Sequence, residues 1–396
     1  MLKIVLTTVL GVFAGVFTGL TPGIHPNTVI FFSMPFYFSS GVETVVYGAF
    51  ISGLAVSHTF HDFIPSLFLG LPDSSTALST IPGIELVSRG RGLEVFRYSV
   101  EGGIYATLTV AILAPLVLAA GPALYPVLEP AMEYLLLFFL ITTILNTSRI
   151  SRSALTAILS GILGLIAFKM PVNQSYVFIP IFSGLFAVPV IVSSFSGRAI
   201  PEQQDIGTVD SVARNGGAAG AMAGLLAGIV PGVGAAIATS FLSPLMTDSR
   251  KQFIAGLGGV NTADTLVSLI ALLALGKARS GPAVAISAVT TVTAPGVAML
   301  SGASLLAAGL SAPIALYAGE KFARFSSGGS SEPLLAAALS VVCVSTLFLT
   351  GFPGALILAT SSVIGYGAML SGDRRPCMAV LIVPAIMFFA EIHIFM

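Results

Sequence analysis

Residues 11–36 read GVFAGVFTGLTPGIHPNTVIFFSMPF, and residues 220–245 read GAMAGLLAGIVPGVGAAIATSFLSPL. Aligned without gaps, the two stretches share three glycines at spacing four, a Pro-Gly pair and a later proline. The identical pairs are Gly11/Gly220, Ala14/Ala223, Gly15/Gly224, Gly19/Gly228, Pro22/Pro231, Gly23/Gly232, Phe32/Phe241 and Pro35/Pro244. The alternative is chance similarity in a Gly/Ala-rich chain. The sequence favours an internal duplication, because a repeated block at matched positions is the mark of a repeat architecture.

A second block continues the alignment. Phe50-Ile51-Ser52-Gly53-Leu54 matches Phe253-Ile254-Ala255-Gly256-Leu257. Farther on, His58-Thr59 falls opposite Asn261-Thr262, and His61 falls opposite Asp264. The duplication therefore extends from the Pro-Gly pairs into two polar segments.

The composition places this chain in a membrane. Of its 396 residues, 55% are hydrophobic and only 9% are charged, and the net charge is zero. Soluble domains carry about 25% charged residues, whereas lipid tails accept an apolar surface.

The charge balance gives no indication of nucleic-acid binding. The two cysteines, Cys343 and Cys377, lie in apolar surroundings and are interpreted as packing residues.

Apolar stretches run along most of the chain, at 2–20, 28–56, 102–120, 131–147, 153–170, 175–195, 216–246, 252–275, 281–319, 334–371 and 377–396. Several are too long for one crossing of a bilayer and too short for two, which favours half-helices or hairpins. We expect an all-α polytopic membrane protein with about 10–12 transmembrane segments.

The longest central polar segment divides the chain nearly in half. Residues 196–215 contain charged side chains and separate two apolar regions of similar length. We therefore expect a first transmembrane repeat at 1–195, a linker at 196–215 and a second repeat at 216–396. The repeats are expected to be pseudo-symmetric and built from broken helices, with inverted topology favoured.

The Pro-Gly pairs indicate where a ligand binds. Proline removes an amide hydrogen and glycine permits helix-breaking conformations. A break at membrane depth needs protein or water to satisfy its backbone groups, and a helix starting after it points positive amides at the gap. Transporters place such breaks in matching positions of two repeats. The alternative is a pair of tight turns at the membrane surface.

The substrate site is expected around both breaks, which differ in polarity. Polar groups follow the first pair, whereas the second has Gly234 and Thr239 and is otherwise nearly bare. Ser74 and Ser75 add hydroxyl groups suited to carboxylate or phosphate oxygens, although such residues are also ordinary helix caps. The expected substrate-binding residues are Thr21, Pro22, Gly23, His25, Asn27, Thr28, Ser74, Ser75, Pro231, Gly232 and Gly234.

Ionisable residues inside apolar segments indicate a second function. Such residues are rare in membranes and usually functional. The candidates for a coupling-ion site are His58, Thr59, His61, Asp62, Asn261, Thr262 and Asp264. Their oxygen atoms suit a hard cation, whereas histidine and carboxylate together suit proton transfer. They could also simply satisfy an interrupted helix, or hold a metal through the histidines, although the H-E-x-x-H pattern is absent.

At these residues the chain resembles a known family. The motif G-x-x-x-G-x-x-P-G at 15–23 and 224–232, Pro82-Gly83 and the following Arg89-Gly90-Arg91-Gly92-Leu93 are similar to the large membrane subunit of tripartite tricarboxylate transporters. The resemblance implies a secondary transporter in the cell membrane, driven by an ion gradient, for carboxylates such as citrate. It also implies a small membrane subunit and an extracytoplasmic binding protein as partners.

This chain departs from the family pattern in ways that affect the substrate. It is shorter than typical large subunits, and His25, Pro26 and Asn27 follow the first Pro-Gly where the family tends to be Gly-rich. We therefore expect the transported substrate to be a small organic anion, with transport coupled to sodium or protons. No cofactor or bound metal is expected. A homodimer in contact with membrane lipids is compatible with this expectation. The rival functions are translocation of a lipid-linked phosphate and intramembrane hydrolysis.

Overall fold

The structure is a computed structural model of the whole chain. It describes residues 1–21, 26–68, 76, 80–147, 149–173, 176–194, 201–204, 211–229, 235, 238–239, 250–276, 278, 280–289, 294–327, 332–372 and 374–391.

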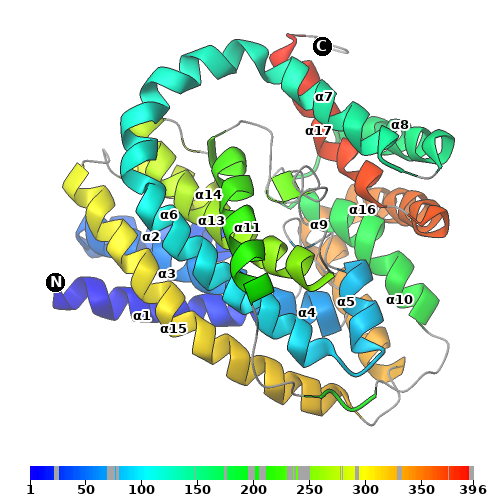
Figure 1. Cartoon of the computed structure of the whole chain (residues 1–396), viewed down its shortest axis with the longest axis horizontal. Coiled ribbons are helices and arrows are strands. Elements are labelled where there is room, and N and C mark those ends of the chain that lie inside the picture. Colours follow the sequence, from blue (N-terminus) through cyan, green and yellow to red (C-terminus); the bar gives the residue numbers. More distant parts are fainter. Residues whose placement is uncertain are drawn as a thin grey trace.

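These residues form helices and no strand, as expected for an all-α protein (Figure 1). The elements are α1 (Leu2–Leu20), α2 (Pro26–Ser40), α3 (Thr44–His61), α4 (Phe63–Phe68), α5 (Thr80–Val87), α6 (Gly92–Leu128), η2 (Glu129–Ala131), α7 (Met132–Leu145), α8 (Ile150–Ala167), α9 (Phe178–Phe182), the π-helical turn η3 (Ser183–Ala187), α10 (Val188–Ser194), α11 (Ser211–Ile229), α13 (Arg250–Leu275), α14 (Gly281–Val289), α15 (Ala294–Ser326), α16 (Glu332–Ser371), η5 (Arg375–Met378) and α17 (Ala379–Phe389).

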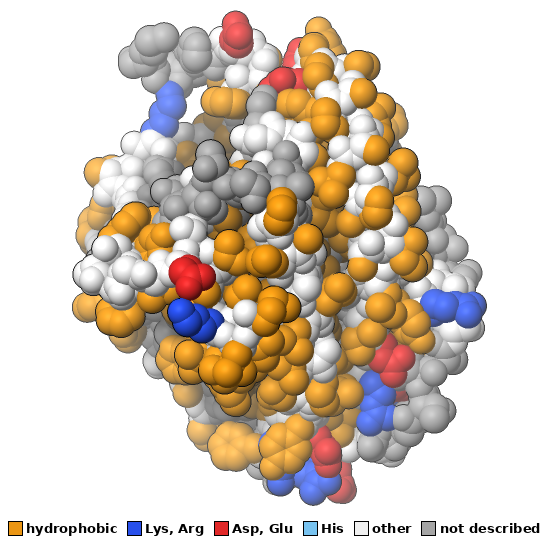
Figure 2. Space-filling model, turned by 90° about the vertical axis from the view of Figure 1, so that its left-hand side faces the viewer, with side chains coloured by type: hydrophobic (Ala, Val, Ile, Leu, Met, Phe, Trp, Pro, Cys, Tyr) orange, Lys and Arg blue, Asp and Glu red, His pale blue; other side chains and the backbone are white. Residues whose placement is uncertain are grey.

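The polytopic membrane class is confirmed. Within the described residues, 6 helices are long and apolar enough to cross a membrane. Two of them, Gly92–Leu145 and Leu335–Ser371, exceed the length of one crossing at 54 and 37 residues. A surface view is covered largely by hydrophobic side chains, with charges in isolated points or small groups (Figure 2). Side chains such as Phe13 and Phe348, 61% and 87% exposed, suit contact with lipid.

Local breaks explain the shapes of the two long helical stretches. The first contains Pro115, Pro122 and Pro126, which weaken the helical hydrogen-bond ladder, and the chain arches from α6 over the molecule into α7 (Figure 1). In α16 the break is Gly351, at φ 63° and ψ −161°, a conformation that glycine alone adopts readily. The helix is thereby divided into two pieces, each of about one membrane thickness.

Close helix packing falls into two sets. The first bundle combines α1 to α6 with α11 and α13 to α15. The second bundle combines α7 to α10 with η3, α16, η5 and α17. The chain passes between them through α6, η2 and α7. Each bundle therefore takes helices from both halves of the sequence. The division into repeats at 1–195 and 216–396 concerns duplication and stays a prediction.

The glycine stripes of the repeated blocks mediate helix packing, as the spacing predicts. A Cβ atom added to Gly11 of α1 would lie 2.2 Å from the carbonyl oxygen of Phe50 in α3. One added to Gly220 of α11 would lie 2.4 Å from the carbonyl oxygen of Gly256 in α13. Because side chains do not fit at such distances, α1 packs on α3, and α11 on α13, through their backbones.

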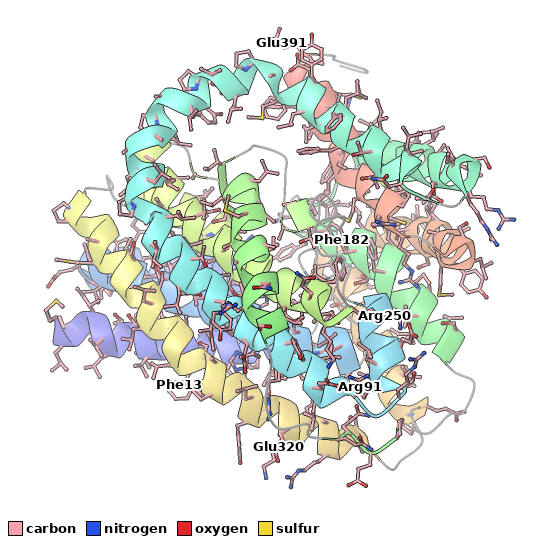
Figure 3. The ribbon with its side chains drawn as sticks, in the orientation of Figure 1. Phe13, Arg91, Phe182, Arg250, Glu320 and Glu391 are labelled. Atoms are coloured by element: carbon pink, nitrogen blue, oxygen red, sulfur yellow. The ribbon has the colours of Figure 1, made fainter. Side chains whose placement is uncertain are left out.

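Ion pairs hold α5, α6 and α13 together at one end of the first bundle. Glu85 accepts hydrogen bonds of 2.6 Å from both Arg89 and Arg250. Glu94 pairs with Arg91 at 2.6 Å and also with Lys251. Arg91 and Arg250 lie on the same side of the molecule (Figure 3). This cluster fixes the start of α13, the helix that supplies Asn261.

Candidate functional site

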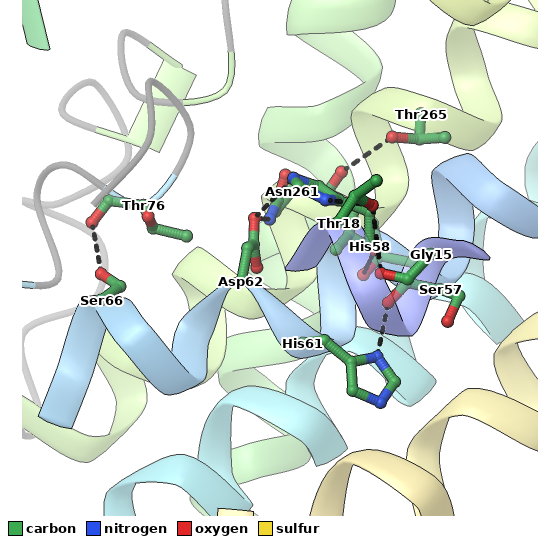
Figure 4. Close-up of polar contacts among 12 residues, drawn as sticks. Gly15, Thr18, Ser57, His58, His61, Asp62, Ser66, Thr76, Asn261 and Thr265 are labelled. Carbon is green, nitrogen blue, oxygen red and sulfur yellow. Dashed lines mark hydrogen bonds and ion pairs between the residues drawn. The ribbon is translucent and has the colours of Figure 1, made fainter. Parts of the chain in front are cut away.

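A buried carboxylate joins the two halves of the chain in the middle of the first bundle. Asp62 follows α3, and its Oδ2 atom accepts a 2.8 Å hydrogen bond from Nδ2 of Asn261 on α13 (Figure 4). The Nε2 atom of His58 lies 3.9 Å from the same oxygen. All three residues are buried, at 4% to 6% exposure. One carboxylate oxygen therefore faces groups from both polar segments.

The imidazole of His58 has a second neighbour, the hydroxyl group of Thr18. Thr18 of α1 donates to the carbonyl oxygen of Gly15 at 3.2 Å, so its oxygen remains as an acceptor. The Nδ1 atom of His58 lies 3.0 Å from that oxygen, within hydrogen-bond distance. The other ring nitrogen, Nε2, is the atom that faces Asp62.

A second contact between the halves lies beside the first. The hydroxyl groups of Thr59 and Thr262 are 3.1 Å apart, and both side chains are buried. In the alignment of the repeated blocks these two threonines are counterparts of each other. Two copies of a unit related by a two-fold axis bring equivalent residues into contact only near that axis. The Thr59–Thr262 contact is the arrangement expected if such an axis passes close to Asp62.

His61 does not join this cluster. Its Nδ1 atom donates to the carbonyl oxygen of Ser57 at 2.7 Å, and its ring points away from Asp62 and Asn261 (Figure 4). The buried Nε2 atom of His61 has no hydrogen-bond partner within the described part of the chain. The structure thus separates His61 from His58, although they are one turn apart on the same helix.

Asp264 is one helical turn beyond Asn261 on α13 and is half-buried. Its backbone nitrogen faces the glycine stripe of α11, because a Cβ atom on Gly224 would lie 2.9 Å from it. Asp62 accepts a hydrogen bond from α13 through Asn261. Asp264 is thus placed near the α11–α13 contact.

The glycine stripe of α1 is what brings this helix to the histidines. A Cβ atom on Gly15 would lie 2.9 Å from the backbone nitrogen of His58, and one on Gly19 would lie 2.6 Å from Cβ of His61. The close approach lets a short side chain, Thr18, reach the imidazole of His58. The packing of the helices and the polar site are therefore consequences of the same glycines.

Most of the expected substrate-binding residues lie outside the described residues. These are Pro22, Gly23, His25, Ser74, Ser75, Pro231, Gly232 and Gly234. Thr21 ends α1, with its amide donating to the carbonyl oxygen of Phe17 at 3.1 Å. Asn27 and Thr28 lie in the first turn of α2, and the side chain of Thr28 is not described.

Asn27 brings the first half of the chain against the second. A Cβ atom on Gly281, the first residue of α14, would lie 2.0 Å from Oδ1 of Asn27. The hydroxyl group of Ser280 accepts a 3.3 Å hydrogen bond from the amide of Ala283 and so caps α14. The N-terminal ends of α2 and α14 therefore meet at Asn27, and both carry the partial positive charge of a helix start.

Two residues of this region were not predicted as candidates. Thr18 is one of three threonines in the apolar helix α1, and its contact with His58 distinguishes it. Gln203 comes from the central linker, accepts a 2.7 Å hydrogen bond from the amide of Gly92 and donates one of 3.1 Å to the carbonyl oxygen of Val87. The linker is thereby fixed to the loop before α6, a pairing that no sequence spacing indicates.

The donor set of the site consists of a carboxylate, two hydroxyl groups, an amide and an imidazole. Within the described part of the chain, no three His, Cys, Asp or Glu residues come together in a way that could hold a metal ion. Asp62 and His58 are a carboxylate–imidazole pair, which can exchange a proton. The oxygen atoms of Asp62, Thr59 and Thr262 are of the kind that hard cations prefer.

Comparison with known proteins identifies related sequences. Residues 5–379 match the tripartite tricarboxylate transporter TctA family. The chain is also similar to an uncharacterized protein of Methanocaldococcus jannaschii, with 26% identity over 288 residues that cover 70% of this chain and 71% of the relative. No solved structure matches.

Proposed function

Because the chain belongs to the tripartite tricarboxylate transporter TctA family, a family of membrane transporters and not of enzymes, we propose that it is a secondary transporter of a di- or tricarboxylate. Transport is coupled to an ion gradient through the cluster of Thr18, His58, Asp62 and Asn261. The substrate binds near the two Pro-Gly breaks, and the coupling ion binds at Asp62.

The observation that carries this proposal is the contact between the two halves at Asp62. A carboxylate in the middle of a membrane protein is costly unless it is paired or functional. Here the pairing group, Asn261, comes from the opposite half of the chain. A change in the charge of Asp62 therefore alters an interaction between the halves, and relative movement of the halves is how repeat-built transporters alternate access.

The meeting of α2 and α14 at Asn27 supports an anionic substrate. Each helix start carries a partial positive charge, which stabilises a carboxylate. Asn27 adds an amide group at the point where both starts meet. Two helix starts from opposite halves suit a molecule with at least two carboxylates, since each can take one.

The surroundings of Asp62 favour a proton over a sodium ion as the coupling ion. Two of the groups that approach Oδ2 are the amide nitrogen of Asn261 and the imidazole of His58, and neither is an oxygen ligand. The proton resides on Nε2 of His58 or on Asp62, and substrate binding favours one of these states. Sodium would require the amide of Asn261 to turn its oxygen toward Asp62.

The family normally works with a small membrane subunit and a periplasmic binding protein. For this chain, the proposed complex has the same composition and resides in the cell membrane. The binding protein delivers the carboxylate, and the helix starts near Asn27 receive it.

Uptake by proteoliposomes tests the proposal. The purified chain, alone and with its accessory subunits, is reconstituted and supplied with radiolabelled citrate, succinate and malate under a proton or a sodium gradient. We expect uptake that depends on the proton gradient and is abolished by a protonophore. The matched control is Asn261→Gln, which retains the amide group and should retain more uptake than Asp62→Asn.

Two outcomes contradict parts of the proposal separately. Uptake driven by sodium at equal pH on both sides would retain the function and exclude proton coupling. Failure to accumulate any carboxylate under either gradient, with all subunits present, would sink the proposed substrate class.

A further inference from the structure

The second bundle contains a buried arginine that the proposed transport cycle does not use. Arg374 lies between α16 and η5 and is only 2% exposed. Its Nη1 atom donates a 2.9 Å hydrogen bond to the carbonyl oxygen of Phe186 in the π-helical turn. Its Nε and Nη2 atoms are buried and have no hydrogen-bond partner among the residues that the structure describes.

The two unpartnered nitrogens define a binding geometry. In a guanidinium group, the Nε–H and Nη2–H bonds lie parallel along one edge, and this edge is the one that holds a carboxylate or phosphate by two hydrogen bonds. The bond from Nη1 to Phe186 lies on the other part of the fork and fixes the plane of the group. Arg374 is therefore oriented by the protein with its two-pronged edge unused.

The charge of this group demands an anion. Burial lowers the pKa of Arg374 to about 10, so the guanidinium stays charged at neutral pH. A buried charge without a counter-charge is strongly unfavourable. Among the residues that the structure describes, no carboxylate forms an ion pair with Arg374. The group that neutralises it is therefore expected to come from outside this part of the chain.

The position of Arg374 indicates which anion is near. The second piece of α16 ends at Ser371 after an apolar run of about one membrane thickness. The chain then turns at Gly372, where φ is 83°. Ser193, near the end of α10, lies 3.8 Å from the sulfur of Met369, so α10 ends at the same level. Arg374 thus follows directly on an apolar span, at the level where lipid phosphates are expected, and Leu370 at the end of that span is 63% exposed.

We propose that the Nε–Nη2 edge of Arg374 binds a phosphate group, held between η5, the end of α16 and the π-helical turn. The lipid headgroup is the nearest source, and inorganic phosphate offers the same oxygens. Because both nitrogens are covered in this structure, a phosphate reaches them only when the side chains over them move apart, so the proposed exchange is slow and the bound phosphate stabilises the second bundle. This inference does not rest on the proposed transport function.

Thermal unfolding of the purified full chain tests the site. The protein is delipidated in detergent and then supplied with phosphatidylglycerol, phosphatidylcholine or inorganic phosphate, without any carboxylate substrate. We expect phosphatidylglycerol to raise the Tm of the unsubstituted protein, by a shift that grows with concentration as required by linkage. A shift with inorganic phosphate alone would identify the free anion as the source and still support the site.

Variants distinguish this site from general lipid effects. Arg374→Gln should lose the Tm shift, and Arg374→Lys should keep only part of it, because lysine has the charge without the fork. The neighbouring Arg375→Gln is the matched control and should respond like the unsubstituted chain. Native mass spectrometry should detect bound phospholipid in that control and not in Arg374→Gln.

The proposal is wrong if neither phosphate source changes the Tm of the unsubstituted protein. It is also wrong if Arg374→Gln retains the full shift or the bound phospholipid. Stabilisation that appears only with the small membrane subunit would assign Arg374 to a protein contact and contradict the proposal. If Arg374→Gln does not fold, the unsubstituted protein and Arg374→Lys still give a decisive answer.

Discussion

The helix pairs α1–α3 and α11–α13 use the same packing and carry different chemistry. In both pairs, glycines at spacing four bring two backbones into direct contact. The first pair carries His58 and leads into Asp62, whereas the aligned positions of the second begin with Asn261 and Thr262. The comparison teaches that close packing is determined by the backbone, whereas ion chemistry depends on a few polar side chains that differ between the pairs.

The two pairs also meet, through one pair of identical residues and one pair of unlike residues. Thr59 contacts its counterpart Thr262, and Asp62 receives a hydrogen bond from Asn261. A symmetric pair of carboxylates at this contact would repel each other in a low dielectric. The asymmetry of the side chains is therefore what allows a single ionisable carboxylate to be shared by both halves.

The largest effect is expected from filling the glycine stripes. Gly11→Val and Gly220→Val place methyl groups where a carbonyl oxygen lies 2.2 Å and 2.4 Å from the added Cβ. Each substitution should lower the free energy of unfolding by about 1–3 kcal/mol or more, because neither backbone can move away without opening the pair. Thermal unfolding followed by size-exclusion chromatography measures it.

A control shows whether the effect belongs to the helix contacts. Gly309 lies in α15 with no heavy atom within 4 Å of an added Cβ, so Gly309→Ala should be tolerated. If Gly11→Val is damaging and Gly220→Val is not, the two pairs are not packed alike, and the comparison between them fails.

The next effect concerns the single carboxylate. Asp62→Asn removes the charge while preserving shape, and we expect gradient-driven uptake to fall at least about tenfold, as for loss of a buried charged partner. Asn261→Asp should also impair uptake, because two buried carboxylates would then face each other. The double variant exchanges the residues and should regain part of the activity. A double variant as inactive as Asp62→Asn would show that His58 beside Asp62 matters more than the contact between the halves.

A smaller effect is expected at the threonine contact. Thr59→Val and Thr262→Val each leave one hydroxyl group without the other, whereas the double variant removes both. A double-mutant cycle of unfolding free energies should give a coupling of about 0.6 kcal/mol and at most about 1.7 kcal/mol, the range for hydrogen bonds between membrane helices. A coupling near zero would mean that the two hydroxyl groups do not interact in the folded protein.

The smallest effect is expected at two ion pairs, one between the exposed ends of α1 and α3 and one that joins the start of α13 to α5. Lys3 pairs with Glu43 at 3.2 Å across α1 and α3, with both side chains at least 70% exposed. Arg250 pairs with Glu85 at 2.6 Å at the start of α13. Exposed ion pairs contribute little, so Arg250→Gln should change stability by less than about 1 kcal/mol and Lys3→Gln by still less. Thermal unfolding in low and high salt measures both, and the difference should vanish in high salt.

Much of the site was predictable because it repeats in the sequence. The polar segments around His58 and Asn261 stand out in apolar surroundings, and their alignment indicates a shared place in the fold. The direction of each side chain was not predictable. His58 and His61 are three residues apart, so they lie about one turn from each other on the same helix. This spacing does not tell which of the two faces Asn261 and which points away from it.

Composition and glycine spacing by themselves determined that this chain is an α-helical membrane protein with two closely packed helix pairs, because water cannot accommodate such an apolar surface and only glycine permits such backbone contact. The tertiary structure alone decided that Asp62 pairs with Asn261 across about two hundred residues of chain. It alone also placed Thr18 on His58 and left the edge of Arg374 unpartnered. These features depend on which helices become neighbours, and local sequence preferences carry no record of distant neighbours.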